Sequence, residues 1–216
     1  MTMTRKVLLS RVLTLSAATL FVSAAHATAT APAVASEKSL KPAVTKYLEK
    51  KGDFCLGKFE WPILVSEDDR KAGTNNALQM PVLEKLGLVK SSDSASDPTV
   101  RAYSLTEEGK KYYLTKRTIT VNSAGQKIRH PGDFCPARLK LAKVVSWDNP
   151  NVVAGQTQTT VKYTYKVVKA AGWAQDPDVR KVFPMIPKIL DNAGNLQLMQ
   201  LFAWSDHGWV AVIPGE

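Results

Sequence analysis

The chain has 216 residues, 29 of them basic and 19 acidic, which gives a formal net charge of +10. Two cysteines and three histidines are too few and too widely separated for an ordinary zinc site, and no G-x-S-x-G, S-x-x-K or glycine-rich phosphate loop occurs. We therefore predict no metal, no cofactor and no catalytic residue, and the common hydrolase and nucleotide-binding classes are not expected.

Residues 1–27 have the features of a secretory signal peptide. A basic segment precedes an apolar run over residues 12–25, and Ala25-His26-Ala27 supplies the small residues that a signal peptidase needs. The alternative is an uncleaved membrane anchor, for which the run is short and wrongly flanked. We predict a bacterial protein that is periplasmic or secreted, with residues 28–38 as a flexible leader and no transmembrane segment in the mature chain.

The mature chain remains basic. Loss of residues 1–27 removes three basic and no acidic residues and leaves a net charge of +7. A positive protein favours anionic partners, such as envelope lipids, lipopolysaccharide, polysaccharide or nucleic acid. The alternative is a soluble protein with a positive surface and no specific anion site, which agrees with charges that are spread along the chain rather than gathered in blocks.

The four residues GDFC occur twice, at 52–55 and 132–135, and contain both cysteines. In an exported chain the two thiols are expected to form a disulfide, Cys55–Cys135, that joins the two halves. Each GDFC precedes a predicted strand, where glycine permits a tight turn, aspartate can bond the loop backbone and phenylalanine can be buried. A catalytic cysteine is the rival interpretation, and either duplication or convergence explains the repeat.

The first half is predicted to begin with a helix from Ser39 to Gly52. A short strand over 58–65 and a helix capped by Ser66 and ended by Gly73 follow. Another helix over 74–86 is expected to bury Leu78, Val82, Leu83 and Leu86.

A hairpin is predicted around the polar loop 91–99, and Thr106 begins a helix after it. The stretch "LEKLGLV…RAYSLTEEGKKYY", residues 83–113, resembles the winged-helix fold, in which a recognition helix leads into a two-stranded wing. This resemblance implies a winged-helix-like unit over residues 39–120.

Winged helices commonly bind DNA, which would place Asn75, Asn76, Gln79 and Lys85 on the face that enters a groove. The expected wing carries Asp93 and Asp97 at its tip, and Lys90 and Arg101 only at its base. Acidic residues at the tip would repel phosphates, so nucleic acid is not the expected partner.

The second half, residues 121–216, is predicted to be a small antiparallel sheet with one helix. Strands are expected over 138–147 and 158–168, a helix over 176–183 and a terminal hairpin over 196–214. The predicted fold class is therefore α+β: a winged-helix-like unit and a sheet unit, joined by a disulfide.

Aromatic residues concentrate in this half and form the candidate surface for a ligand or protein partner, with core packing as the alternative. The candidates are Trp147, Tyr163, Tyr165, Trp173, Trp204 and Trp209.

The stretch "VKYTYKVVKAAGWAQDPDVRKVFP" resembles small exported proteobacterial proteins without an assigned activity. Some of these are similar to carbapenem intrinsic-resistance proteins, periplasmic partners that protect a producer without hydrolysing the drug. The preferred hypothesis is a non-catalytic protein that binds a protein partner or an anionic envelope component. The rival is an enzyme whose site is assembled from scattered residues. A buried cleft in which His207, Asp206 and a polar nucleophile meet would indicate such a site.

Overall fold

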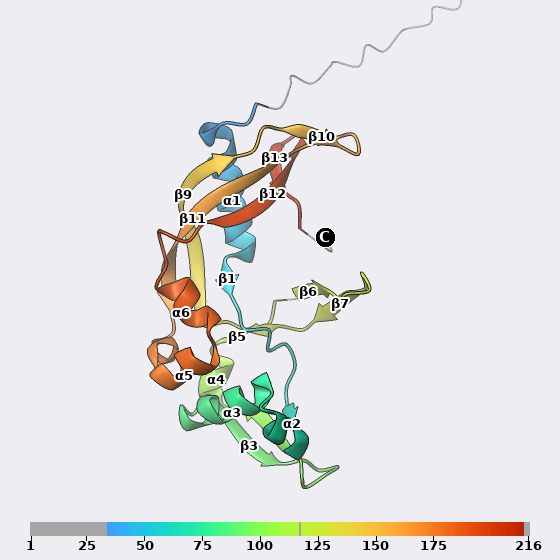
Figure 1. Cartoon of the computed structure of the whole chain (residues 1–216), viewed down its shortest axis with the longest axis vertical. Coiled ribbons are helices and arrows are strands. Elements are labelled where there is room, and N and C mark those ends of the chain that lie inside the picture. The colour runs from blue at the N-terminus through green and yellow to red at the C-terminus, as the bar shows by residue number, and fades with distance from the viewer. Residues whose placement is uncertain (1–33, 117, 214–216) are drawn as a thin grey trace, which may run out of the picture. The chain divides into compact units, whose positions relative to one another are not determined.

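A computed structural model of the chain describes residues 34–116 and 118–213 (Figure 1). The predicted signal peptide and most of the leader lie outside these residues. Within them, the largest sheet has six strands that pair antiparallel in the order β1-β9-β11-β12-β13, with β10 added beside β11. Its strands are β1 (Asp53–Phe54), β9 (Ala137–Trp147), β10 (Asn151–Val153), β11 (Gln156–Ala170), β12 (Leu198–Ser205) and β13 (Gly208–Ala211).

The first helix, α1 (Glu37–Lys51), packs on this sheet. Its buried residues Leu40, Val44 and Leu48 recur every four positions and form one apolar stripe. The stripe packs in one core against residues of β9, β11, β12 and β13, among them Tyr163 and Phe202. The sheet must curve around the helix, because α1 contacts both β9 and β13, which are separated by two strands in the sheet order.

Two expectations for this helix were wrong. Its N-cap is Ser36 rather than Ser39, because Ser36 and Ser39 satisfy each other's backbone N–H groups in a capping box. The helix also packs on the sheet of the second half instead of within the first half, since the concave sheet face buries its whole apolar stripe. Its end at Gly52 was predicted correctly.

A second group of elements contains the smaller sheet β2-β4-β3. The predicted hairpin is confirmed, with Val89 opposite Leu105, and Ile63 pairs with Tyr103 on the other side of β4. Three helices accompany this sheet, and the predicted caps Ser66 and Thr106 each accept a backbone N–H. The elements are β2 (Ile63–Val65), α2 (Glu67–Ala72), α3 (Asn75–Lys85), β3 (Val89–Asp93), β4 (Arg101–Leu105) and α4 (Glu107–Lys110).

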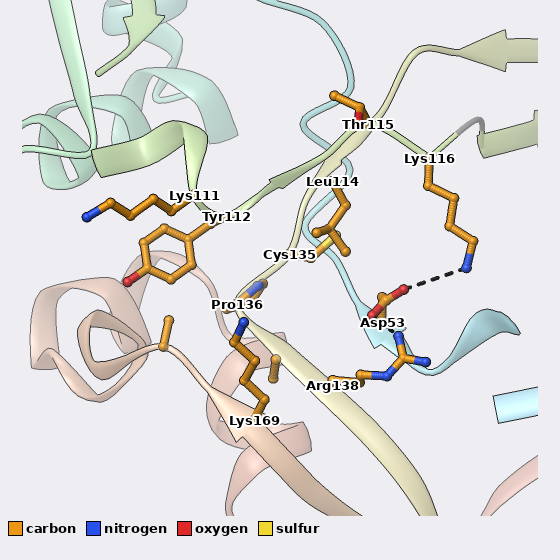
Figure 2. Close-up of a pocket in the computed structure, with 12 residues that line it drawn as sticks. Asp53, Lys111, Tyr112, Leu114, Thr115, Lys116, Cys135, Pro136, Arg138 and Lys169 are labelled. Carbon is orange, nitrogen blue, oxygen red and sulfur yellow. Dashed lines mark hydrogen bonds and ion pairs between the residues drawn. The ribbon is translucent and has the colours of Figure 1, made fainter. Parts of the chain in front are cut away.

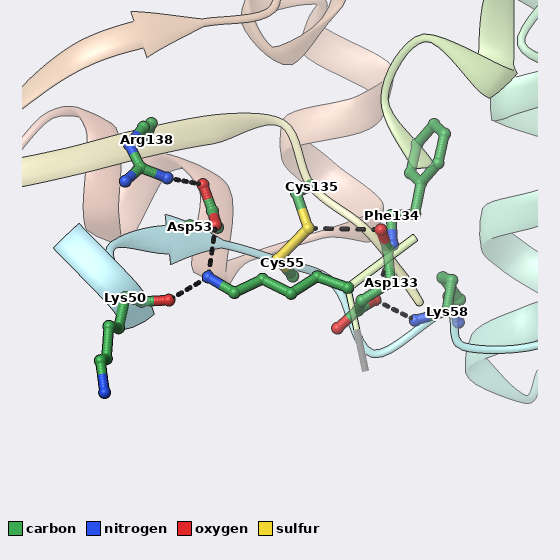
Figure 3. The surroundings of a disulfide bond; sticks show 9 residues. Lys50, Asp53, Cys55, Lys58, Asp133, Phe134, Cys135 and Arg138 are labelled. Atoms are coloured by element: carbon green, nitrogen blue, oxygen red, sulfur yellow. Dashed lines mark hydrogen bonds and ion pairs between the residues drawn. A yellow bond between two sulfur atoms is a disulfide. The ribbon is translucent and has the colours of Figure 1, made fainter. Parts of the chain in front are cut away.

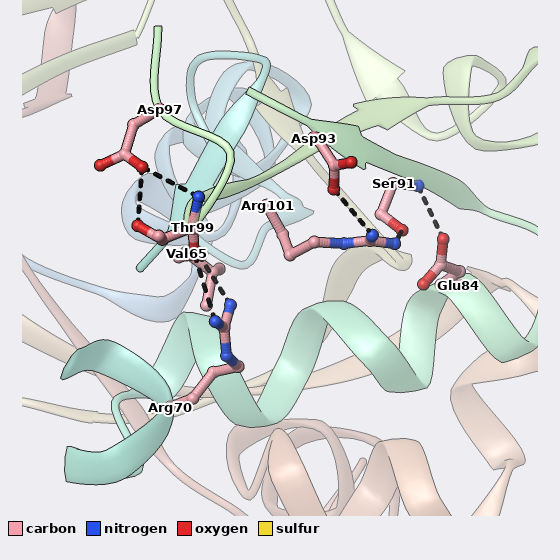
Figure 4. Close-up of polar contacts among 8 residues, drawn as sticks. All are labelled: Val65, Arg70, Glu84, Ser91, Asp93, Asp97, Thr99 and Arg101. Atoms are coloured by element: carbon pink, nitrogen blue, oxygen red, sulfur yellow. Dashed lines mark hydrogen bonds and ion pairs between the residues drawn. The ribbon is translucent and has the colours of Figure 1, made fainter. Parts of the chain in front are cut away.

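The predicted buried face of α3 was partly wrong. Met80 and Leu83 are buried, but Leu78 is 53% exposed. The burial face is rotated because α3 packs against α5 (Pro177–Val182), where the Gln79 side chain donates to the Val182 carbonyl at 2.9 Å. Ion pairs and side-chain bonds tie the rest of this group together (Figure 4), including Arg101 with Asp93 at 3.1 Å.

Residues from both sides of residue 120 build both main cores. The core around α3 includes Phe134, Val179 and Ile186 from the second half, brought there by α5 and the neighbouring α6 (Met185–Leu190). The other core receives α1 from the first half. The remaining described elements are β5 (Tyr113–Leu114), β6 (Thr118–Val121), β7 (Lys127–His130), β8 (Asp133–Phe134) and η1 (Gly172–Gln175).

The predicted disulfide between Cys55 and Cys135 is present and joins the two GDFC segments (Figure 3). Neither glycine has room for a side chain: a Cβ on Gly52 would lie 2.3 Å from the Leu48 carbonyl oxygen, and one on Gly132 would lie 2.5 Å from that of Leu114. Glycine is therefore required in both copies for close backbone packing, and the φ of Gly52 lies in the ordinary helical region.

The two aspartates of the repeat make reciprocal contacts. Asp53 pairs with Arg138, three residues after Cys135, at 2.5 Å. Asp133 accepts the backbone N–H of Lys58, three residues after Cys55, at 2.8 Å (Figure 3). Each GDFC segment thus anchors the chain that follows the other one, so the repeat has an architectural role.

Substitution of Asp133 tests this role. The Asp133 Oδ1 atom accepts the N–H groups of Lys58 and Phe134, so Asp133→Ala is expected to lower the free energy of unfolding by at least about 2 kcal/mol, because two donors lose their acceptor. Asp133→Asn keeps that acceptor and is expected to cost under about 1 kcal/mol. Denaturant unfolding at neutral pH measures both, and equal losses would contradict the proposed role of the oxygen.

The same pair of variants predicts a pH dependence. Burial raises the pKa of the Asp133 carboxyl, although backbone N–H groups oppose the shift. A folded-state pKa above the unfolded one means that this group favours folding at low pH, and that the contribution is lost as the pH rises through the folded pKa. We expect Asp133→Asn to remove this pH dependence, which unfolding curves recorded from pH 4 to 8 would reveal.

Candidate functional site

Four cations lie in two directly opposed pairs on strands β9 and β11. Arg138 is the cross-strand partner of Lys169, and Lys140 is the partner of Lys166. The register shifts between Val167 and Lys169, and this irregularity places Lys169, rather than Val168, opposite Arg138. We call these four residues the basic ladder.

Like charges placed directly opposite each other destabilise a sheet. Of the ladder, Lys140, Lys166 and Lys169 are exposed, and Arg138 is half-buried. Asp53 neutralises Arg138, whose guanidinium also donates to the Glu49 carbonyl. Lys169 has no ion-pair partner among the described residues. The ladder therefore keeps an excess of positive charge that an anion could neutralise.

A cavity of about 500 Å³ adjoins one end of the ladder (Figure 2). Arg138 and Lys169 line it together with Lys111 and Lys116, and Asp53 is the one carboxylate in the lining. Its size lies in the ordinary range for small-ligand sites. Figure 2 shows that Lys169 lies beside Pro136 and Tyr112, with Arg138 and Asp53 on the other side of Pro136.

Local bonds orient most of these cations. Lys111 pairs with Glu108, and both side chains are largely exposed. Lys116 lies 3.8 Å from a carboxylate oxygen of Asp53 and donates to the Lys50 carbonyl. The chemistry that this lining offers is electrostatic attraction and hydrogen-bond donation to a negatively charged group.

A smaller pocket of about 210 Å³ continues from the other end of the ladder. Arg138 lines both hollows, and Lys140 and Lys166 line the smaller one with Lys41 and Glu49. The positive surface thus extends along β9 on both sides of Arg138.

The structure places most of the predicted aromatic surface in the cores. Tyr163 and Tyr165 are 2% and 0% exposed, so they cannot contact a partner in this fold. Burial also raises the pKa of both phenols. Trp209 is buried, and Trp147 and Trp204 are half-buried, in the core between α1 and the large sheet. Trp173 stacks on Phe134 in the core around α3.

The rival enzyme site does not assemble around His207. The Ser205 hydroxyl donates to the Gly208 carbonyl and accepts the backbone N–H of His207, so these residues form a closed turn between β12 and β13. His207 lines a groove of about 240 Å³ with Tyr47 and Trp209, between α1 and β13. Within the described residues, no cluster of His, Cys, Asp or Glu has the arrangement of a metal site.

Three of the four α3 residues expected to read DNA make contacts within the protein, and the fourth, Asn75, is exposed. Gln79 bonds to α5, and Lys85 forms an ion pair with Asp178 at 2.8 Å that raises the pKa of the lysine. Asn76 accepts a bond from the Lys58 ammonium. These side chains are thus directed at neighbouring elements.

Sequence inspection missed the basic ladder. One part of its signal was the pair of cations at alternate positions of a strand, Arg138 and Lys140. The other part was Lys166 and Lys169, three positions apart in the next long strand. Spacing along the chain concealed the cluster, because only the cross-strand register brings the two sets together.

Comparison of the chain with protein-family models, curated proteins and solved structures finds no match. In the part of the chain that the structure describes, no helix is both long and apolar enough to cross a membrane.

Proposed function

We propose that this chain is an exported, non-catalytic binding protein for an anionic ligand, which binds at the basic ladder and the adjoining 500 Å³ cavity. The proposal rests on one observation, the two pairs of directly opposed cations, Arg138 with Lys169 and Lys140 with Lys166. Such an arrangement costs folding energy, and it is useful where a ligand supplies the opposite charge.

Three further features support export to the bacterial envelope. The first 27 residues predict a signal peptide, the mature chain is basic, and Cys55–Cys135 is a disulfide of the kind that oxidising compartments maintain. An anionic envelope component is therefore the ligand class that we propose.

We further propose that the group of elements around the sheet β2-β4-β3 is a winged-helix-like unit whose role is structural. The order strand, helix, helix, hairpin in β2, α2, α3, β3 and β4 supports this, and α3 uses Gln79 and Lys85 of its expected DNA-reading face to contact α5. The resemblance of the second half to exported proteobacterial proteins agrees with a binding role that needs no catalysis.

A protein partner is the second candidate. The groove between α1 and β13 supports it, since Tyr47 and Trp209 line the groove and β13 stands at the end of the sheet order, where its outer backbone groups have no strand partner in the described sheet. The charge of the ladder favours the anionic ligand.

Titration of the mature protein with tripolyphosphate tests the proposal. The double variant Lys166→Ala/Lys169→Ala removes one cation from each opposed pair, and we expect affinity to fall about five- to tenfold while the free energy of unfolding stays equal or rises by up to about 1 kcal/mol. A variant that merely damaged the fold would lower both quantities. Calorimetry and denaturant unfolding measure them.

Lys38→Ala/Lys188→Ala is the matched control, because it removes the same charge from exposed positions outside the lining of the cavity. It should lower affinity by less than about twofold, since distant charges are screened. The proposal is wrong if tripolyphosphate does not bind, or if both double variants weaken it equally.

A further inference from the structure

A second cavity, of about 420 Å³, adjoins the disulfide, because both cysteines line it, and the charged part of its wall consists of Lys50, Lys51, Lys116, Asp53 and Asp133. Its wall includes apolar side chains from five elements that are far apart in the chain. These are Phe54, Leu114, Leu139, Met185, Ile189 and Leu198. A hollow with this lining favours an apolar ligand group.

Two of these side chains make the hollow accessible. Met185 on α6 is 48% exposed and Leu114 on β5 is 36% exposed, although both are large and apolar. Ile189 and Leu139, which are each 6% exposed, lie deeper in the same wall. The cavity therefore has an apolar wall beside its charged one, and part of the apolar wall reaches solvent.

The two cavities share part of their walls. Asp53, Leu114, Lys116 and Cys135 line both, so the two hollows meet beside the disulfide, and the second has more large apolar side chains in its wall than the first (Figure 2). A single ligand could place a charged group on one side and a hydrocarbon chain on the other. The charge of Lys169 and Arg138 fixes the sign of the charged group as negative.

We propose that the ligand is an anionic amphiphile with one hydrocarbon chain, bound as a monomer. Its phosphate or carboxylate group contacts Arg138, Lys169 and Lys111, and its chain lies between Leu114, Met185 and Leu139. This inference rests on the proposed function and names the ligand class of the same site. Apolar burial adds affinity in proportion to chain length, whereas the cations alone bind any polyanion weakly.

Calorimetric titration with dodecyl phosphate, kept below its micelle concentration, tests the inference against two reference compounds. Ethyl phosphate has the same charged group without the chain, and dodecyl maltoside has the chain without the charge. We expect dodecyl phosphate to bind at least about tenfold more tightly than ethyl phosphate, because burial of two methylene groups already gives a factor of this size. It should also bind more tightly than dodecyl maltoside, because only the phosphate can pair with the cations.

Met185 lines only the second cavity, so Met185→Gln should weaken the binding of dodecyl phosphate at least about threefold and leave tripolyphosphate binding unchanged. The matched control is Met199→Gln, since Met199 is 65% exposed and lines neither cavity. Lys166→Ala/Lys169→Ala should weaken dodecyl phosphate and tripolyphosphate alike.

Each failure has a separate meaning. The amphiphile proposal is wrong if dodecyl phosphate binds no more tightly than ethyl phosphate or than dodecyl maltoside. The proposed anion site is still supported in that case if tripolyphosphate binds. Binding only to vesicles with anionic lipid, and not to the monomer, also overturns the amphiphile proposal. Loss of tripolyphosphate binding in the unmodified protein overturns the proposed function itself.

Discussion

Replacing both Cys55 and Cys135 by alanine is expected to lower the free energy of unfolding by about 4–5 kcal/mol. The disulfide links residues 80 positions apart, and closing a loop of this length removes much of the freedom of the unfolded chain. A loss of this size is a large part of the total stability of a typical domain. Guanidinium unfolding of the variant beside the oxidised protein measures it.

The reduced protein with its cysteines intact is the control. It keeps every side chain and lacks only the sulfur–sulfur bond, so it should be destabilised almost as much as the alanine variant. If the midpoint is the same with and without reductant, the crosslink contributes nothing. If the alanine variant alone is unstable, packing of the sulfur atoms is responsible instead.

The substitution Phe134→Ala is expected to cost about 3–5 kcal/mol, because it leaves a large cavity in a core. Phe134 is 0% exposed and lies between Trp173, at a ring-centroid distance of 5.4 Å, and the edges of Trp61 and Tyr112. Loss of the ring removes the contacts with three aromatic partners at once, so neighbouring side chains cannot close the gap easily. Thermal and denaturant unfolding measure the effect.

Phe54 is a matched control, since it occupies the same place in the other GDFC segment but is only partly buried at the margin of two cores. Phe54→Ala should cost less than half as much as Phe134→Ala. Equal costs would show that the two copies are energetically equivalent, against the burial that the structure gives them.

Local signals predicted much of the secondary structure. The caps Ser66, Thr106 and Asp176 begin helices as expected, and the terminal hairpin of β12 and β13 was recognised from its turn. Such elements were predictable because a side-chain oxygen bonds to a backbone N–H two or three residues away. The disulfide was predictable from compartment and cysteine number.

Long-range packing was not predictable in the same way. Leu40, Val44 and Leu48 indicate an amphipathic helix, but nothing in their spacing tells which sheet will cover them. The basic ladder depends on the register of β9 against β11, and the aromatic residues chosen as a surface are the ones that core packing requires. Burial and register are properties of the partner strands, which one segment does not encode.

The association of α1 with β13 places the chain's first described helix against its last described strand. More than 150 residues separate them, so this contact cannot form until almost the whole polypeptide is present. Contacts with such separation in sequence make folding slow, because the loop must close before the contact forms. The apolar stripe of Leu40, Val44 and Leu48 therefore stays only partly covered, by residues of β9 and β11, until β12 and β13 have also emerged.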